Sequence, residues 1–315
     1  MRRILVTGAG GQIGSELVPT LRARYGAESV LAPDIRALHD GAAAGGPFQV
    51  LDATEQDALA AAAMRFNADS IYHLAAILSA IGEKDPQLAY RINMGGLLNV
   101  LEVARTHGCS VFHPSSIGAF GPGTPADPAP QDTLQRPTTM YGVTKVAGEL
   151  LCDYYHQRFG VDARGVRYPG LISHIAQPGG GTTDWAVDIF YHAVAEGRYT
   201  CFLAQDTQLD MMYMPDAIRA AIEVMEADPA QLRHRNAFNV TAMQLSPERL
   251  ASEIRKHLPD FVIDYDVDPV REAIAQSWPR RIDDSAAHEE WGWSPEYGLE
   301  AMTADMITQL QARRA

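Results

Sequence analysis

Apolar and polar residues follow one another along the first half of the chain in a way that predicts strands separated by helices. Short apolar runs are typical of buried strands, and they occur at residues 3–8, 29–34, 69–76 and 110–116. Apolar residues three or four positions apart predict helices between these runs, at residues 13–26, 56–66 and 94–108. Strands that alternate with helices favour a parallel sheet with helices on both faces.

The pattern is less regular in the second half of the chain. A proline-rich stretch at 121–137 precedes another helical segment, a glycine-rich stretch at 176–184 follows it, and residues 185–197 again read as a helix. We therefore predict an α/β fold with a Rossmann-type doubly wound parallel sheet over residues 1–170. A smaller carboxyl-terminal lobe covers residues 171–315, and some of its segments return to the first domain.

The charge balance argues against polyanionic partners. Lys plus Arg number 26 and Asp plus Glu number 39 among the 315 residues, so the formal net charge is −13. A chain this acidic repels nucleic-acid backbones and anionic membrane surfaces. We therefore expect a small molecule, and neither nucleic acid nor membrane, as the partner.

The three cysteines, Cys109, Cys152 and Cys201, are odd in number and widely spaced. Their spacing fits neither a disulfide framework nor a Cys-x-x-Cys metal site. The 10 histidines form no close cluster of zinc type with them, so we expect no metal. A reduced, cytoplasmic setting is the expectation, since no apolar run suits a signal peptide or a membrane span.

The sequence VTGAGGQIGSEL places Gly8, Gly11 and Gly14 between a predicted strand and a predicted helix. In a dinucleotide site the first glycine allows the tight turn, the second lets the backbone approach the pyrophosphate, and the third lets the helix pack on the strand. The helix N-terminus then offers N–H groups to phosphate. A flexible turn is the alternative, but the context predicts that residues 1–170 bind a dinucleotide.

Two acidic residues refine this prediction. Asp34 ends the second predicted strand, 20 residues after Gly14, where a carboxylate would bind ribose hydroxyls and repel a 2′-phosphate, so NAD is favoured over NADP. Arg36 lies close enough in sequence to weaken that preference. Asp52 is suited to the adenine amino group, although a helix N-cap explains it nearly as well and the two roles are compatible.

Tyr141 and Lys145 lie four positions apart in PTTMYGVTK, so a helix would place both side chains on one face. The pair is common by chance, and a dinucleotide site gives it a chemical meaning. A free tyrosine has a pKa of about 10, and a nearby ammonium together with the nicotinamide charge would favour its phenolate. Tyr141 would then take a hydroxyl proton while hydride leaves the same carbon.

Several motifs occur in the order found in one enzyme superfamily. The glycine series, HLAA at 73–76, PSSIGAFG at 114–121 and the pair Tyr141-x-x-x-Lys145 cover most of the first 170 residues. Together they resemble the extended branch of the short-chain dehydrogenase/reductase superfamily.

This resemblance implies that three residues are catalytic, Ser116, Tyr141 and Lys145. Counting back from Gly121 puts the family's serine at Ser116 rather than Ser115, where it would hold the substrate oxygen. Lys145 would also bond the nicotinamide ribose. Asn93 fits the family's proton-relay asparagine, with a helix-start residue as an equal alternative. The implied contacts to NAD are Gly8, Gly11, Gln12, Ile13, Gly14, Asp34, Arg36, Asp52, Ala53, Leu74, Ala75, Ala76, Asn93, Tyr141, Lys145, Tyr168 and Pro169.

The carboxyl half narrows the resemblance. Nucleotide-sugar epimerases and dehydratases usually carry a segment like Arg-x-x-Asn where this chain reads VRYPG at 166–170. The segments HLAAILSAIGEKDP, GGGTTDWAVDIFYHAV and SWPRRIDDSAAHEEWGW look instead like the short-chain family of L-threonine 3-dehydrogenases. That family oxidises the threonine β-hydroxyl with NAD to 2-amino-3-oxobutyrate, without zinc, in the route from threonine to glycine.

The same resemblance implies that the substrate contacts are Ser79, Ser116, Tyr141, Thr182, Thr183 and Trp278. Short hydroxyl residues suit a zwitterion, whose carboxylate needs donors and whose ammonium needs acceptors. Ordinary loop caps are the alternative for Ser79 and the two threonines, and core packing is the alternative for Trp278.

The resemblance further implies a homodimer, joined through helices at about 94–107 and 142–159 into a four-helix bundle. Leu97, Leu98 and Leu101 fit that interface, and they fit burial in the core equally. Two rival functions are a nucleotide-sugar epimerase or dehydratase and a non-enzymatic NAD-binding regulator. The PGGGTTD loop lacks positive charge for a diphosphate, and such regulators commonly lose the tyrosine or lysine, so both rivals are weaker.

Overall fold

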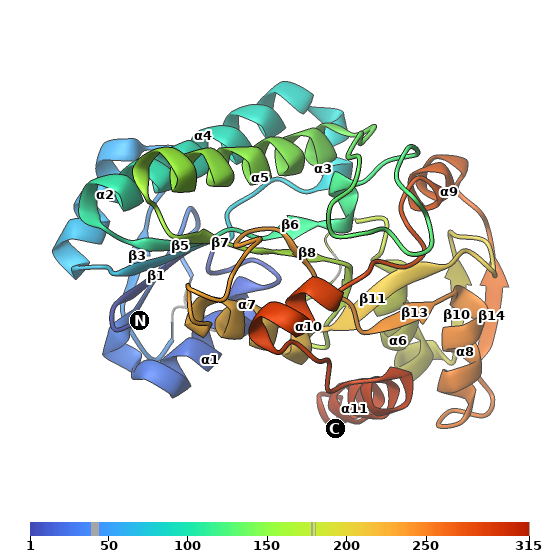
Figure 1. The fold of residues 1–315 in the computed structure, drawn as a ribbon. Helices are drawn as coiled ribbons and strands as arrows, with labels where there is room; N and C mark the ends of the chain where they lie inside the picture. Colours follow the sequence, from blue (N-terminus) through green and yellow to red (C-terminus); the bar gives the residue numbers. More distant parts are fainter. Residues whose placement is uncertain (39–43, 178, 180, 315) are drawn as a thin grey trace.

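The central sheet has six parallel strands in the order β3-β2-β1-β4-β5-β7, which confirms the predicted doubly wound sheet (Figure 1). These strands are β1 (Ile4–Thr7), β2 (Val30–Asp34), β3 (Phe48–Val50), β4 (Ser70–His73), β5 (Ser110–Phe112) and β7 (Ala163–Arg164). The computed structural model describes residues 1–38, 44–177, 179 and 181–314. The strand order reverses between β1 and β4, and ligands of such sheets bind beyond the carboxyl ends of the strands at this reversal.

Helices cover both faces of this sheet (Figure 1). One face carries α2 (Gln56–Phe66), α4 (Pro86–His107) and α5 (Met140–Phe159), and the other carries α1 (Gly14–Tyr25), α7 (Met214–Glu226) and α10 (Ser285–Trp291). Helix α2 has the predicted bounds, whereas α4 begins at Pro86 rather than Met94. The earlier start has a local cause, because the Asp85 carboxylate accepts a hydrogen bond from the backbone N–H of Leu88 at 2.9 Å. The short helix α3 (Ser79–Lys84) precedes α4.

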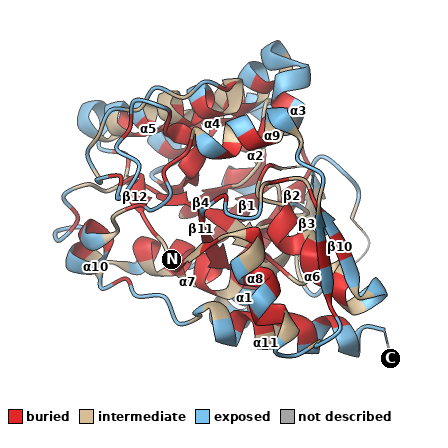
Figure 2. Cartoon of the chain, turned by 90° about the vertical axis from the view of Figure 1, so that its right-hand side faces the viewer, coloured by how far each residue is buried: buried red, intermediate tan, exposed pale blue. Residues whose placement is uncertain are grey.

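Alternate residues of β1 pack against the two helical layers. Ile4 and Val6 belong to a buried cluster with residues of α1 and α7, whereas Leu5 belongs to a cluster with residues of α2 and α4. This alternation is what a strand buried on both faces requires. Buried residues accordingly run through the strands and the inner sides of the helices, while exposed residues lie outside (Figure 2).

Three short strands continue the sheet layer beyond β5 and β7. They are β6 (Ser115–Ser116), β8 (Val166–Tyr168) and β12 (Phe238–Asn239), which run parallel in the order β12-β8-β6. Because β12 comes from the carboxyl-terminal half, the chain returns to the central layer late in its course. The domain boundary at residue 170 stays a prediction.

The carboxyl-terminal lobe has its own buried centre, which contains Trp185, Phe190, Leu209 and Met211. Its strands form the sheet β13-β11-β9 and the pair β10-β14, with bounds β9 (Gly170–Ile172), β10 (Arg198–Cys201), β11 (Leu209–Tyr213), β13 (Met243–Leu245) and β14 (Val262–Tyr265). Its helices are α6 (Trp185–Glu196), α8 (Pro247–Arg255), α9 (Pro269–Gln276) and α11 (Leu299–Ala312). None of the helices in the described part of the chain is long and apolar enough to cross a bilayer.

Candidate active site

The turn from β1 to α1 packs tightly against its surroundings. Gly8 has a φ of +70°, and a Cβ there would lie 2.7 Å from the backbone nitrogen of Ala75. A Cβ on Gly14 would lie 2.5 Å from the carbonyl oxygen of Gly8. The packing of the turn therefore requires glycine at both positions. Helix α1 begins at Gly14, so the partial positive charge of its N-terminus is directed at this turn.

Asp34, at the end of β2, is buried and ties that strand to the glycine turn. Its carboxylate accepts hydrogen bonds from the backbone N–H groups of Gly10 (2.9 Å) and Arg36 (3.0 Å). The Arg36 guanidinium lies 3.3 Å from the same carboxylate and donates to the Gly10 carbonyl oxygen at 2.9 Å. Both predicted residues thus lie at one corner of the turn, and the preference for NAD over NADP stays a prediction.

Asp52 follows β3 and stabilises a turn. Its Oδ1 accepts hydrogen bonds from the backbone N–H and the hydroxyl of Thr54, both at 2.8 Å. The N-terminal cap of α2 is Glu55, so the interpretation of Asp52 as a helix cap is wrong. Its contact with adenine stays a prediction. The neighbouring Ala53 is buried, and its carbonyl oxygen accepts a hydrogen bond from Asn99 at 3.1 Å.

Two adjoining cavities lie at the carboxyl ends of the strands. The outer groove, of about 440 Å³, is lined by the glycine turn, Ser15, Arg36 and residues Ile175–Gln177. The inner cavity, of about 150 Å³, shares Gln12, Leu78 and Asp184 with the outer groove. A glycine turn at a helix N-terminus, with a carboxylate at the next strand end, fits the pyrophosphate and ribose of a dinucleotide.

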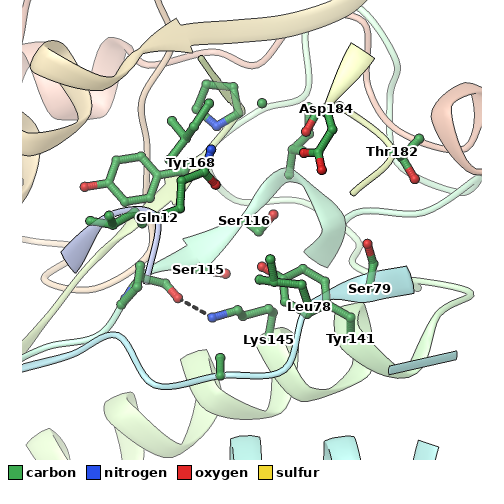
Figure 3. Close-up of a pocket in the computed structure, with 18 of the residues that line it drawn as sticks. Gln12, Leu78, Ser79, Ser115, Ser116, Tyr141, Lys145, Tyr168, Thr182 and Asp184 are labelled. Carbon is green, nitrogen blue, oxygen red and sulfur yellow. Dashed lines mark hydrogen bonds between the residues drawn. The ribbon is translucent and has the colours of Figure 1, made fainter. Parts of the chain in front are cut away.

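Most predicted site residues line the inner cavity. From the predicted cofactor contacts it includes Gln12, Ile13, Leu74, Ala76, Tyr168 and Pro169, and from the catalytic and substrate sets Ser79, Ser116, Tyr141, Lys145, Thr182, Thr183 and Trp278. The ring of Tyr168 faces the cavity, while its hydroxyl donates to the Ala217 carbonyl oxygen at 2.6 Å, away from the site (Figure 3). Ala75 lies behind Gly8 instead, in contact with the turn.

The three predicted catalytic side chains meet where β6 faces α5 (Figure 3). Lys145 is buried, and its Nζ donates to the carbonyl oxygen of Pro114 at 2.7 Å. Tyr141 and Ser116 line the inner cavity together, and Ser116 favours the charged form of the tyrosine by lowering its pKa. The Ser115 hydroxyl donates instead to the carboxylate of Glu149, so Ser116 is the serine that acts on the tyrosine.

Burial shifts the pKa of both members of the Tyr141–Lys145 pair. It raises the pKa of Tyr141 above its ordinary value, and the hydrogen bond from Ser116 acts in the opposite direction. It lowers the pKa of Lys145 to about 8, against the opposing effect of the Glu149 charge. In the protein alone burial therefore dominates the pKa of Tyr141, and the expectation that Lys145 and the nicotinamide charge together lower it stays a prediction. Nζ of Lys145 lies 5.5 Å from the Tyr141 ring centroid and is bonded to Pro114.

Asn93 connects the segment after β4 to α5. Its Oδ1 accepts a hydrogen bond from the backbone N–H of Ile77 (2.7 Å), and its Nδ2 donates to the Ile77 carbonyl oxygen and the Thr144 hydroxyl, both at 3.1 Å. The alternative of a helix-start residue is wrong, because Asn93 lies in the middle of α4. The side chain lies outside both cavity linings, and its role as a proton relay stays a prediction.

Loops supply the other wall of the inner cavity. Ser79 begins α3, Thr182 and Thr183 precede α6, and Trp278 follows α9. Thr182 is 4% exposed, so its hydroxyl is largely shielded from solvent. Trp278 also belongs to the buried cluster of the carboxyl-terminal lobe, so it serves the core and the cavity at once.

Sequence reasoning missed several residues of the cavity wall, namely Leu78, Pro114, Ile117, Leu171 and Asp184. The apolar ones carried no signal, because an apolar residue in sequence is more typical of the core than of a site. Asp184 carried a weak one, since an aspartate before a predicted helix is typical of an N-cap. Its carboxylate accepts a hydrogen bond from the Gly181 N–H at 2.6 Å and so closes the loop around the two threonines. Among the described residues, no group of three or more His, Cys, Asp or Glu side chains could hold a metal ion.

Comparisons with known proteins agree with this geometry. The sequence model of the NAD dependent epimerase/dehydratase family matches residues 4–241. An uncharacterized epimerase/dehydratase of Staphylococcus haemolyticus is 55% identical over 314 residues, which cover 99% of each chain. The structure of an L-threonine dehydrogenase from Clostridium difficile is 52% identical with a TM-score of 0.98, over 99% of this chain and 98% of that one. A monomeric L-threonine 3-dehydrogenase from a metagenome is 43% identical with a TM-score of 0.95, over 99% and 100% of the two chains.

The family match spans the glycine turn, the serine at the end of β6 and the tyrosine–lysine pair of α5. The sequence resemblance to the extended short-chain dehydrogenases is thereby confirmed. This chain belongs to the NAD dependent epimerase/dehydratase family.

Proposed function

We propose that this protein oxidises the β-hydroxyl of L-threonine with NAD to give 2-amino-3-oxobutyrate. The observation that carries the proposal is the inner cavity, where Tyr141 and Ser116 face the hydroxyl residues Ser79 and Thr182 (Figure 3). Its volume of about 150 Å³ is below the roughly 300–1,000 Å³ of sites for drug-sized ligands. An amino acid matches this size. The high identity to structures named L-threonine dehydrogenase supports the same substrate.

The side chains of this chain have distinct tasks in that reaction. Bound NAD supplies the acceptor for the hydride that leaves the β-carbon. Ser116 holds the β-hydroxyl oxygen, and Tyr141, as a phenolate, accepts the proton of that hydroxyl, so that the C–O single bond becomes a carbonyl. Because burial raises the pKa of Tyr141, the phenolate forms only while Lys145 keeps its positive charge nearby.

A nucleotide-sugar epimerase or dehydratase is the second candidate, favoured by the name of the family and of curated relatives. A nucleotide-sugar diphosphate needs cationic partners. Among the described residues that line the inner cavity, Lys145 is the basic one, and it is bonded to Pro114. The cavity therefore favours the amino acid. A non-enzymatic NAD-binding regulator would have no use for the Tyr141–Lys145 pair.

The experiment that separates these functions is a substrate comparison. Purified protein is mixed with NAD and either L-threonine, D-threonine or UDP-glucose. Reduced nicotinamide is followed by absorbance with the two amino acids, and the epimeric sugar nucleotide is measured by chromatography with UDP-glucose. We expect turnover with L-threonine and none with D-threonine. Epimerisation of UDP-glucose without oxidation of L-threonine would overturn the proposal in favour of the second candidate. Binding of NAD without turnover of either substrate would favour the regulator.

We also propose that the protein acts in the cytoplasm, in the degradation of threonine to glycine. All three cysteines, Cys109, Cys152 and Cys201, are free and buried. Unpaired thiols suit a reducing compartment.

A homodimer joined through α4 and α5 is the further proposal. Leu97 and Leu101 are fully buried in the core of this chain, so they are not available to contact a second copy. Leu98 is 43% exposed and stays a candidate for the interface. The exposed apolar side chains of the two helices are Tyr90, Leu98, Val143, Leu150, Tyr154 and Phe159. Two packed helices that both present apolar side chains to solvent fit a second copy of the same surface.

The oligomeric state tests this surface directly. We expect the wild-type mass from sedimentation equilibrium to be that of a dimer, and the Leu98→Glu/Leu150→Glu variant to be monomeric. Val270→Glu, at an apolar residue of α9 that is 67% exposed, is the matched control and should stay dimeric. A monomeric wild type, as in the metagenome relative, would contradict the proposal.

A further inference from the structure

Three consecutive residues, Pro114 and the two residues of β6, lie against three consecutive turns of α5. Pro114 accepts a hydrogen bond from Lys145, Ser115 donates one to Glu149, and Ser116 lines the inner cavity together with Tyr141. Tyr141, Lys145 and Glu149 are four residues apart, so they lie along one side of the helix. The catalytic pair therefore has a third member on the same helix face, one turn beyond the lysine.

Glu149 is 5% exposed, and both of its carboxylate oxygens are fully engaged. Besides the Ser115 hydroxyl, Oε1 accepts from Arg167 Nε at 3.0 Å. Oε2 accepts from Arg167 Nη2 and from Gln135 Nε2, both at 2.9 Å. Four donor groups from three residues, Ser115, Gln135 and Arg167, thus hold the buried carboxylate of Glu149 in one place.

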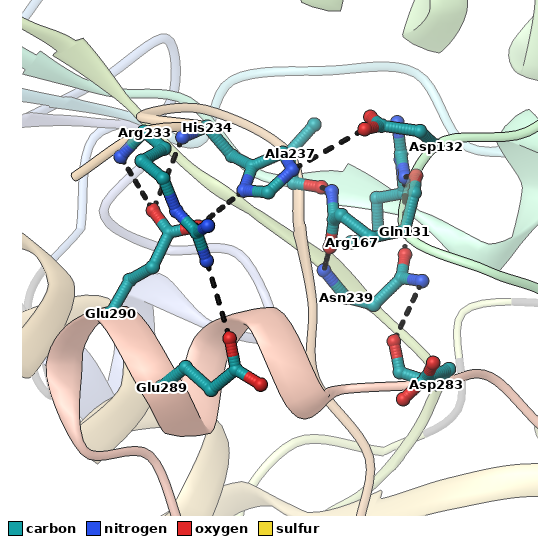
Figure 4. Close-up of polar contacts among 10 residues, drawn as sticks. All are labelled: Gln131, Asp132, Arg167, Arg233, His234, Ala237, Asn239, Asp283, Glu289 and Glu290. Carbon is teal, nitrogen blue, oxygen red and sulfur yellow. Dashed lines mark hydrogen bonds and ion pairs between the residues drawn. The ribbon is translucent and has the colours of Figure 1, made fainter.

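Arg167, on β8, is itself held from its other side. Its Nη1 donates to the Gln131 carbonyl oxygen at 2.8 Å and to Asn239 Oδ1 at 3.1 Å (Figure 4). Glu149 and Arg167 line a third cavity, of about 280 Å³, that lies behind the catalytic residues. The Ser115–Glu149 hydrogen bond therefore spans the wall between this rear cavity and the inner cavity.

The charge of Glu149 acts on Lys145 in a defined direction. The groups that affect Lys145 are Glu149 and Cys152 of α5, which favour its charged form, and burial, which disfavours it. His73 and His113, which lie behind it, have lowered pKa values and remain neutral, so they contribute no opposing charge at neutral pH. Asp153, one turn further along α5, faces Glu149 and is bonded to Asn236.

We propose that Glu149 is a positioning residue of this active site, which holds Ser116 in place through Ser115 and keeps Lys145 charged. The catalytic part of this inference rests on the proposed dehydrogenase function. The electrostatic part does not, because the charge of Lys145 is a property of the protein itself.

The lysine content makes the electrostatic part directly measurable. The chain has three lysines, Lys84, Lys145 and Lys256. Protein labelled with [13Cε]lysine therefore gives three NMR signals. The variants Lys84→Arg and Lys256→Arg each lose one signal and so identify the signal of Lys145. We expect the titration midpoint of Lys145 to move to lower pH by about one pH unit in Glu149→Gln. Asp153→Asn removes a carboxylate from the same helix and should leave the midpoint unchanged. Glu149→Asp, which retains the charge, should restore it toward the wild-type value. A folded Glu149→Gln variant with the wild-type midpoint would overturn the electrostatic role.

Ser115→Ala tests the positioning role, and it keeps the Glu149–Arg167 ion pair intact should Glu149→Gln fail to fold. We expect kcat for L-threonine to fall roughly tenfold while the Lys145 midpoint and NAD affinity stay unchanged. In Glu149→Gln the loss of activity toward alkaline pH should begin at lower pH than in the wild type. Wild-type kcat in Ser115→Ala would refute the positioning role. A wild-type protein that does not oxidise L-threonine, but whose Lys145 midpoint depends on Glu149, would refute the proposed function and leave the electrostatic role standing.

Discussion

The two walls of the inner cavity are built in different ways. The first wall, with Ser116, Tyr141 and Lys145, consists of one strand end and one long helix. Tyr141 and Lys145 are one helical turn apart, and Ser116 comes from the strand. The opposite wall takes Ser79, Thr182 and other residues from segments that are far apart in sequence and lie at element ends or in loops. In the proposed function the first wall carries the proton chemistry that any hydroxyl substrate needs. The second wall is proposed to decide which substrate enters.

The largest expected effect comes from the first wall. Tyr141→Phe removes the proton acceptor but keeps the ring, so we expect kcat for L-threonine to fall roughly 10²–10⁴-fold. NAD affinity, measured by calorimetry, should be unchanged. If Tyr141→Phe kept most of the wild-type rate, Tyr141 would not be the proton acceptor, and the first wall would not have the chemical role that distinguishes it from the second.

The glycine turn should be the next most sensitive point. Gly14→Ala places a Cβ 2.5 Å from the Gly8 carbonyl oxygen, so α1 has to move away from β1. Overpacking of about 1–3 kcal/mol corresponds to a loss of NAD affinity of roughly 5–150-fold. Gly95→Ala in α4 is the control, since a Cβ there meets nothing within 4 Å. Calorimetric titration with NAD checks both, and equal affinities of the two variants would show that the turn tolerates the methyl group.

The second wall should respond in affinity rather than in rate. Thr182→Val keeps the shape of a buried side chain and removes its hydroxyl, so we expect KM for L-threonine to rise roughly tenfold. The kcat value and NAD affinity should change little. Thr308→Val, on an exposed turn of α11, serves as the control for the substitution itself. A fall in kcat at unchanged KM would contradict this division of roles, because it would show that the second wall takes part in the chemical step.

The smallest expected effect is on stability. Lys145 holds its proton up to about pH 8 in the folded protein, but up to about pH 10.4 in the unfolded chain. The buried charge therefore destabilises the fold fully below pH 8, and this penalty disappears as pH rises toward 10.4. We expect Lys145→Met to be more stable than the wild type by about 1–2 kcal/mol at pH 7, after allowance for the lost bond to Pro114. Urea titrations at several pH values should show this advantage shrinking with rising pH, and an advantage that grows instead would contradict the depressed pKa.

The same contrast explains how much of the molecule the sequence predicts. The glycine turn and the first wall follow local rules. The spacing of Gly8 and Gly14 favours a tight turn between a strand and a helix, and the spacing of Tyr141 and Lys145 places both side chains on one side of a helix. The central sheet follows from the alternation of short apolar runs with helical spacing, although β3, which is three residues long and half-exposed, carries too weak a pattern to stand out.

The second wall has no such local rule. Ser79, Thr182 and Trp278 were predicted by resemblance to a family, and nothing in their immediate neighbours indicates that they meet. Asn93 and Asp52 show the opposite problem, since a single polar residue admits several local partners. Their true partners, Ile77, Thr144 and Thr54, become evident only in the folded chain.

The late return of β12 to pair with β8 bears on how this architecture can acquire new substrates. A fragment that ended at residue 170 would lack β12, α7 and α10, and α1 alone would cover the sheet face that carries Ile4 and Val6. We therefore expect residues 1–170, where we propose that the dinucleotide binds, to be unstable when they are transplanted as a separate module. We expect new substrate specificities in such a chain to arise by substitutions in the loops of the second wall. Exchange of whole domains by recombination would disrupt the sheet.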